Sequence, residues 1–189
     1  MVHLRFVDNR AYLGEDEIEL SERMFLQNKN ITEISGRCPD SVFTLYLGRN
    51  QISSLFGAHG EKFDAGNLRG LRLDNNKITS LFDENGNQFQ TNNITTLTME
   101  NNLIPSLFNK DGVQFMPGKI RILDLVENKI SRVMNELHEP FKPGNLKKIH
   151  LAGNPIATMP EECHKIEGLE GVLYLVKKSK PHISALGHD

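Results

Sequence analysis

Leucine-type residues recur along the chain in a short motif, in which two of them flank one variable residue and an asparagine follows three positions later. Copies of this motif begin at residues 45, 71, 97, 123 and 149, so each copy lies 26 residues after the one before. A degenerate copy begins at Met24. Alternate side chains of a β-strand share one face, so each Leu-x-Leu pair predicts a short strand with one apolar face. Such a strand cannot bury its face alone, and stacked copies form a continuous core, so the pattern predicts a solenoid.

Aromatic residues recur between the strands with the same spacing of 26 residues. One series is Phe56, Phe82 and Phe108, and a second series is Phe63, Phe89, Phe115 and Phe141. Between the two series lie Gly60, Gly86 and Gly112, with Asn and Asp as neighbours, which is a composition typical of turns. We therefore expect stacked phenylalanine columns on the convex side of the solenoid, joined by polar turns.

The repeated motif, L-x-L-x-x-N-x-I, resembles that of the leucine-rich repeat family, and the resemblance runs from Met24 to Met159. It implies an α/β fold: a leucine-rich repeat solenoid that forms a right-handed superhelix, with a parallel β-sheet on its concave face and a cap at each end. It also implies that the repeated asparagines point inward and bond the backbone, namely Asn50, Asn76, Asn102, Asn128 and Asn154. The first copy has Lys29 at this position, which is consistent with an atypical end repeat.

This pattern divides the chain into three predicted segments. Residues 1–23 are expected to form a strand-rich N-terminal cap, residues 24–159 about six repeats, and residues 160–189 a helical C-terminal cap and tail. Within the last segment, Leu169, Val172, Leu173 and Val176 have the spacing of one helical face. That segment resembles the closing cap of cytosolic leucine-rich repeat proteins.

Composition narrows the class of partner. The chain has 22 Lys and Arg against 24 Asp and Glu, and this balance argues against nucleic-acid binding. No apolar run reaches the ~18 residues of a membrane span, and no secretory signal is evident near the N-terminus. Cys38 and Cys163 are expected to be reduced thiols. We therefore expect a monomer in the cytoplasm that neither binds nucleic acid nor inserts into membranes.

Three candidate sites for chemistry fail on spacing. Gly112 to Ile120 resembles a phosphate-binding loop, but it has one residue too many between its glycines and Ile120 replaces the required hydroxyl. Asp83, Asn85 and Asn87 lack the glycine and glutamate positions of a calcium loop. Cys163, His164 and His182 lack zinc-ligand spacing. We therefore expect no catalytic residue, no metal and no cofactor.

Function is then expected on the outward side of the strands, where residues alternate with the buried leucines. Exposed aromatic and arginine side chains are typical anchors of protein interfaces. The predicted partner-binding residues are Phe25, Tyr46, Arg49, Arg72, Asp74, Glu100, Asp124 and His150. The convex loops remain an alternative location.

The leading hypothesis is a non-enzymatic module that binds another protein on its concave face. The family resemblance also suits a secreted bacterial effector that acts in the host cytoplasm. The alternative hypothesis is a substrate-recognition or regulatory component of an enzyme system, such as ubiquitin ligation or small-GTPase regulation. An extracellular receptor is a third reading, and the absence of cysteine-rich caps counts against it.

Overall fold

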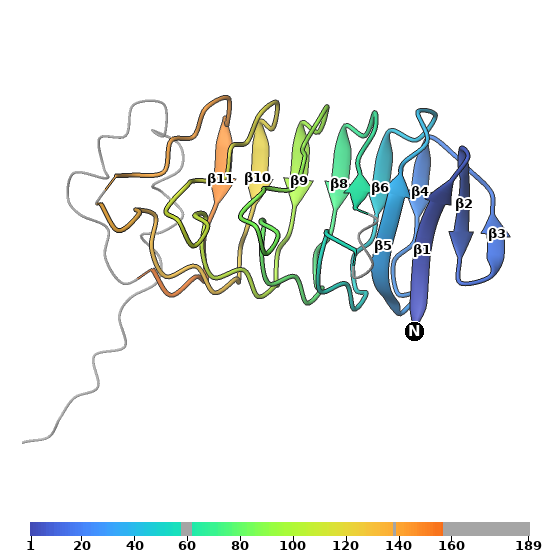
Figure 1. Cartoon of the computed structure of the whole chain (residues 1–189), viewed down its shortest axis with the longest axis horizontal. Helices are drawn as coiled ribbons and strands as arrows, with labels where there is room; N and C mark the ends of the chain where they lie inside the picture. The colour runs from blue at the N-terminus through green and yellow to red at the C-terminus, as the bar shows by residue number, and fades with distance from the viewer. Residues whose placement is uncertain (58–61, 138, 157–189) are drawn as a thin grey trace, which may run out of the picture.

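The computed structural model of the chain describes residues 1–57, 62–137 and 139–156, and it stacks successive coils along one long axis (Figure 1). The strands among these residues are β1 (Val2–Val7), β2 (Arg10–Leu13), β3 (Asp16–Ile18), β4 (Arg23–Phe25), β5 (Ile31–Arg37), β6 (Thr44–Tyr46), β7 (Phe63–Asp64), β8 (Gly70–Arg72), β9 (Thr96–Thr98), β10 (Ile122–Asp124) and β11 (Lys148–His150).

The repeated motif forms the front sheet, a parallel sheet of six strands in the order β11-β10-β9-β8-β6-β4. Each copy of the motif contributes one strand, as its alternation predicts. Pairing is in register, so the first leucine-type residues of successive copies stand in one row. This row is buried in every coil, and its members are Met24, Leu45, Leu71, Leu97, Leu123 and Ile149.

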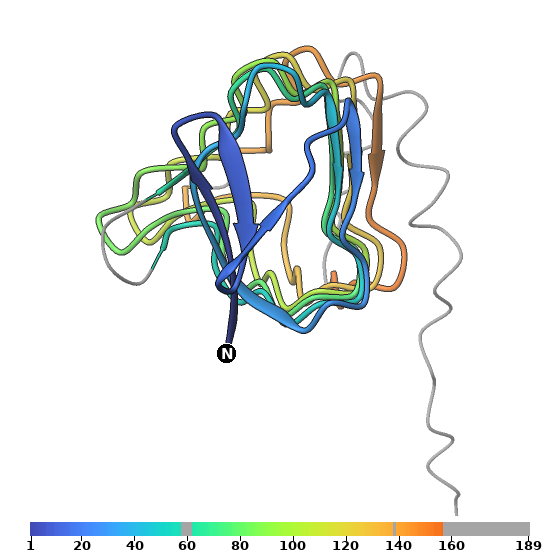
Figure 2. The same ribbon diagram turned by 90° about the vertical axis from the view of Figure 1, so that its right-hand side faces the viewer.

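The back sheet has five strands in the order β3-β2-β1-β5-β7. Strand β1 pairs in parallel with β5, and the antiparallel pairs β1 with β2 and β2 with β3 continue the sheet. The coil is seen end-on in Figure 2, with the front sheet on the right and the N-terminal strands on the left. The first residues of the chain therefore extend the back wall of the solenoid, where Leu4 and Phe6 join its core.

The predicted α/β fold class is wrong. The described part of the chain contains no helix, and the molecule is a β-solenoid of parallel strands rather than a strand-and-helix repeat. The solenoid and its 26-residue repeat are present.

The return legs explain why no helix forms between the strands of the front sheet. The hydroxyl of Ser80 accepts the backbone N–H of Phe82 at 2.9 Å and donates to its carbonyl at 2.8 Å, which makes a tight turn. A short hairpin follows at once, closed by an antiparallel bridge between Phe82 and Gln88, and Gly86 supplies its left-handed turn residue with φ of 82°. Turns this close together leave no segment long enough for a helix. The same bridge recurs between Phe56 and Lys62, Phe108 and Gln114, and Met134 and Pro140.

The asparagine ladder is confirmed. Asn102 Oδ1 accepts the N–H of Ile78 at 3.0 Å, and its Nδ2 donates to the carbonyls of Leu73 and Met99, each at 3.0 Å. One amide thus satisfies backbone groups in two consecutive coils. Asn50, Asn76, Asn128 and Asn154 make the equivalent bonds and are also buried.

The second phenylalanine series is buried behind the front sheet, and in the first series Phe82 is buried while Phe56 and Phe108 are partly buried. Phe63 and Phe89 stack with their ring centroids 6.1 Å apart and their planes 5° from parallel. Phe82 meets Phe115 edge-on at 6.5 Å, and Phe108 meets Phe141 in the same way at 6.4 Å. The second phenylalanine series is therefore interior, as expected, although only its first two rings stack face to face.

Two predicted features lie outside the described residues: the turn glycine Gly60, and the helical cap in residues 160–189. Within the described ranges, no helix is long and apolar enough to cross a bilayer.

Candidate functional site

The candidate site is the solvent-facing side of the front sheet, called here the strand face. The outward residue of each strand follows a buried leucine-type residue, so the outward residues also stand in register across the sheet. From the first strand to the last, this outer row consists of Phe25, Tyr46, Arg72, Thr98, Asp124 and His150. Unlike the buried row, it changes residue type in every coil.

Three residues at the N-terminal end of the outer row form a continuous stack. The rings of Phe25 and Tyr46 lie 4.5 Å apart at 17° from parallel, and the guanidinium of Arg72 lies over the Tyr46 ring, 5.4 Å from its centroid. Phe25 is 61% exposed. Aromatic stacking and the cation–π contact fix the three side chains relative to one another before any partner arrives. We call Phe25, Tyr46 and Arg72 the aromatic stack.

Carboxylates gather on the next strands, and we call Asp74, Glu100, Asp124 and Glu127 the acidic stretch. Asp74 Oδ2 accepts the Thr98 hydroxyl at 2.8 Å, and its Oδ1 accepts the N–H of Glu100 at 3.2 Å. Glu100 is exposed, yet local desolvation raises its pKa, and repulsion from Asp124, Asp74 and Glu127 raises it further. The charges of the other three carboxylates therefore act on Glu100.

Two of the predicted site residues contact each other at the C-terminal end of the strand face. His150 Nδ1 lies 3.3 Å from Asp124 Oδ2, and Asp124 Oδ1 accepts the N–H of Val126 at 3.1 Å. Lys147 and Lys148 are exposed beside this pair. The face is therefore basic at the end opposite the aromatic stack.

Arg49 lies at the rim of the strand face, one residue before ladder residue Asn50. Its backbone is left-handed with φ of 57°, a conformation that the equivalent Asn75 and Gly153 adopt more easily. Glu127 has the same conformation with φ of 53°. Two charged side chains are thus held at the rim at a cost of about 1 kcal/mol each.

The alternative chemical sites have structural roles. Asp83 Oδ1 accepts the N–H groups of Asn85 and Asn87, so this carboxylate closes the second hairpin. The ammonium of Lys62 lies 2.9 Å from Asp83 and, with the Asn87 side chain, holds the pKa of that carboxyl well below its usual range. Cys38 is buried, and desolvation, with help from Asp64, raises the pKa of its thiol to about 12. A thiol in this state is a poor nucleophile.

No group of three His, Cys, Asp or Glu residues among the described parts of the chain is placed to hold a metal ion. The segment that resembles a phosphate-binding loop forms the third hairpin and its return to β10, with Phe115 and Ile120 in the core. Cys163, His164 and His182 lie outside the described residues.

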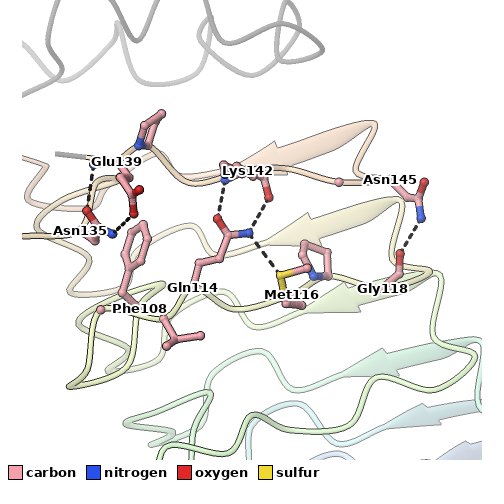
Figure 3. A pocket seen from close by; sticks show the side chains of 13 residues that line it. Phe108, Gln114, Met116, Gly118, Asn135, Glu139, Lys142 and Asn145 are labelled. Atoms are coloured by element: carbon pink, nitrogen blue, oxygen red, sulfur yellow. Dashed lines mark hydrogen bonds between the residues drawn. The ribbon is translucent and has the colours of Figure 1, made fainter. Parts of the chain in front are cut away.

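The hairpin side carries a second ladder that sequence reasoning missed. The amide of Gln114 accepts the N–H of Lys142 at 2.9 Å and donates to its carbonyl at 3.0 Å (Figure 3). Gln88 makes the same pair of bonds with Met116 in the preceding coil, at 2.8 and 3.1 Å. The two glutamines are 26 residues apart, and this spacing was the signal available in the sequence.

A groove runs between the third and fourth hairpins, beside Gln114. Phe108, Met116 and Pro140 line it, together with polar groups of Asn135 and Lys142 (Figure 3). Val113 and Met116 at its edge are each 57% exposed. This groove is the structural counterpart of the convex-loop alternative.

Neither models of known protein families nor the curated proteins give any match to this chain.

Proposed function

We propose that this protein is a non-enzymatic module that binds a partner protein on its strand face. The aromatic stack carries the proposal, because Phe25 and Tyr46 present aromatic surface to solvent on two adjacent strands. On the same two strands the first leucine-type residues, Met24 and Leu45, are buried and belong to the core, whereas the two rings lie on the opposite, outward side.

Physical chemistry favours this location as an interface. Tyr, Phe and Arg are enriched at protein interfaces, and a few such residues provide most of the binding energy. Stacking restrains the rings of Phe25 and Tyr46 and the guanidinium of Arg72, which reduces the side-chain entropy lost on binding. A rigid, preformed surface of this kind is how solenoid proteins bind their partners.

The cellular setting that we propose is the cytoplasm, or the host cytoplasm if the chain is an injected effector. The free, buried thiol of Cys38 supports it, because unpaired thiols suit a reducing compartment.

The test is a pull-down that compares the unmodified chain with the pair Tyr46→Ala and Arg72→Glu. We expect loss of the partner, with a change in stability of about 0.5 kcal/mol or less, because surface changes rarely exceed that. The matched control is the pair Glu84→Ala and Lys110→Ala, two exposed residues on successive hairpins, and it should keep the partner. Loss of the partner only in the hairpin pair would move the interface to the convex loops.

A further inference from the structure

The strand face changes chemical character along the axis of the solenoid. Strands β4 and β6 carry the aromatic rings and β8 carries Arg72, whereas the carboxylates of the acidic stretch follow on β8, β9 and β10 or directly after them. Lys148 on β11 then reverses the sign of the charge. A partner that covers this face must match an apolar anchor site and a negative region in that order.

Distances along the sheet set the length of the matching segment. Four strand-to-strand steps separate β4 from β10. At about 4.8 Å for each step, they cover roughly 19 Å. An extended chain rises ~3.4 Å per residue, so about six residues laid across the strands would reach from Phe25 to the level of Asp124.

Glu100 is a carboxylate that such a segment can reach. It is exposed, and its side chain makes no hydrogen bond with the part of the chain that the structure describes. Asp74 is already bonded to Thr98, and Asp124 to His150. Local desolvation and, after it, the neighbouring carboxylates raise the pKa of Glu100, so a cation brought to this position would relieve repulsion that is present in the unbound protein.

We infer that the strand face binds an extended, basic segment of the partner protein, with an aromatic or aliphatic anchor at one end and Lys or Arg residues after it. The inference rests on the proposed function and adds the chemistry of the occupant. The anchor packs against Phe25 and Tyr46, the guanidinium of Arg72 donates to a backbone carbonyl of the segment, and the basic side chains meet the acidic stretch.

Charge complementarity decides against the other occupants. A nucleic acid or an acidic peptide would place its negative charges over Glu100 and Glu127, and like charges across an interface cost several kcal/mol. The exposed Lys147 and Lys148 repel a basic segment at the far end. This repulsion limits the segment to the region between β4 and β10 and fixes its register.

The experiment is selection of a random peptide library on the immobilised full chain, with peptides long enough to cross five strands. We expect the bound pool to be enriched in Lys and Arg on one side of a single aromatic or aliphatic residue. Affinity for a synthetic peptide of the enriched sequence should fall at least ~10-fold in the pair Glu100→Lys and Glu127→Lys. It should be unchanged in the matched pair Glu84→Lys and Glu136→Lys, which places the same charges on exposed hairpin residues.

The outcomes separate this inference from the proposed function. A pool rich in Asp and Glu, a pool with no preference, or equal loss in both charge-reversal pairs would overturn the basic-segment inference. If such a pool still loses binding in the pair Tyr46→Ala and Arg72→Glu, the strand face remains the interface and only the occupant is wrong. If peptide binding is lost only in the hairpin pair Glu84→Lys and Glu136→Lys, the proposed function on the strand face fails as well. Polyuridine, added as a separate probe, should not bind. Binding of polyuridine that is lost in Arg72→Glu would mean that the occupant is a nucleic acid and not a peptide.

Discussion

The inner and outer rows of the front sheet differ although they belong to the same strands. The inner row repeats one chemical type in every coil, and the asparagine ladder beside it repeats one residue. The outer row passes from aromatic to cationic, polar, acidic and imidazole side chains over six strands. Both rows have the same backbone and the same register, so the difference does not come from the fold.

This comparison separates the residues that hold the molecule together from those that we propose bind a partner. Repetition is needed where each coil must fit onto the next, because an interior position meets the same neighbours in every turn. Outer positions meet solvent, so packing leaves them unconstrained. A run of chemically different, preorganised side chains in such positions is therefore the best indication of a binding surface.

The largest expected loss of stability comes from a substitution in the buried aromatic layer. Phe89→Ala removes a ring that is 1% exposed and stacked on Phe63, and the cavity should cost about 3–5 kcal/mol. Chemical denaturation of the two proteins measures it. Phe25→Ala is the control, because the same deletion at an exposed ring removes mainly its stacking on Tyr46 and should cost only about 0.5–1.5 kcal/mol. Equal losses at the two positions would contradict the division into inner and outer roles.

The next effect concerns the asparagine ladder. Asn102→Ala leaves the buried N–H of Ile78 without its partner and removes one of the two amide donors to the carbonyls of Leu73 and Met99, which should cost about 1–3 kcal/mol. The control is Asn101→Gly, because Asn101 is exposed and a glycine keeps its left-handed backbone, with φ of 52°. A melting curve for Asn102→Ala that matches the unmodified protein would show that the ladder does not support the coils.

The smallest expected change in stability comes from Glu100, on the outer side of the front sheet. The pKa of Glu100 is raised in the folded protein. Ionisation of Glu100 therefore lowers the stability of the fold as the pH rises from the pKa of this group in the unfolded chain to its higher pKa in the folded protein. Glu100→Gln should therefore raise the melting temperature slightly at neutral pH, and the gain should vanish in acid, where Glu100 is protonated in both states. Thr79→Ala, at an exposed position away from the carboxylates, is the control. A gain that persists unchanged in acid would mean that the ionisation of Glu100 is not its cause.

The sequence predicted the features that depend on the repeat and failed on those that depend on local turn chemistry. Leu71, Asn102 and Phe89 could be placed because each belongs to a column with a fixed spacing. The adjacency of Phe25 and Tyr46 followed from the same register. The α/β fold class was wrong, because it was taken from family resemblance, whereas Ser80 and the hairpin after Phe82 turn the chain too soon for a helix.

Other features could not be read from periodicity. Strand β1 lies outside the repeat, and its parallel partner β5 is distant in sequence, so their pairing depends on tertiary contacts. Glu127 and Arg49 have left-handed backbones at a position where Asn or Gly is usual, and only the comparison of coils reveals it. The glutamine ladder of Gln88 and Gln114 had the right spacing, but an exposed-looking polar residue gave no reason to test it.

The central claim is tested most directly by two neighbouring residues of β8, the inner Leu71 and the outer Arg72. The measurement is partner capture per mole of folded protein, at a temperature where Leu71→Ala and Arg72→Glu are both folded. Leu71→Ala should lose about 2–5 kcal/mol of stability and still capture the partner. Arg72→Glu should keep its stability within about 0.5 kcal/mol and lose the partner. Capture that persists in Arg72→Glu but disappears in folded Leu71→Ala would contradict the account.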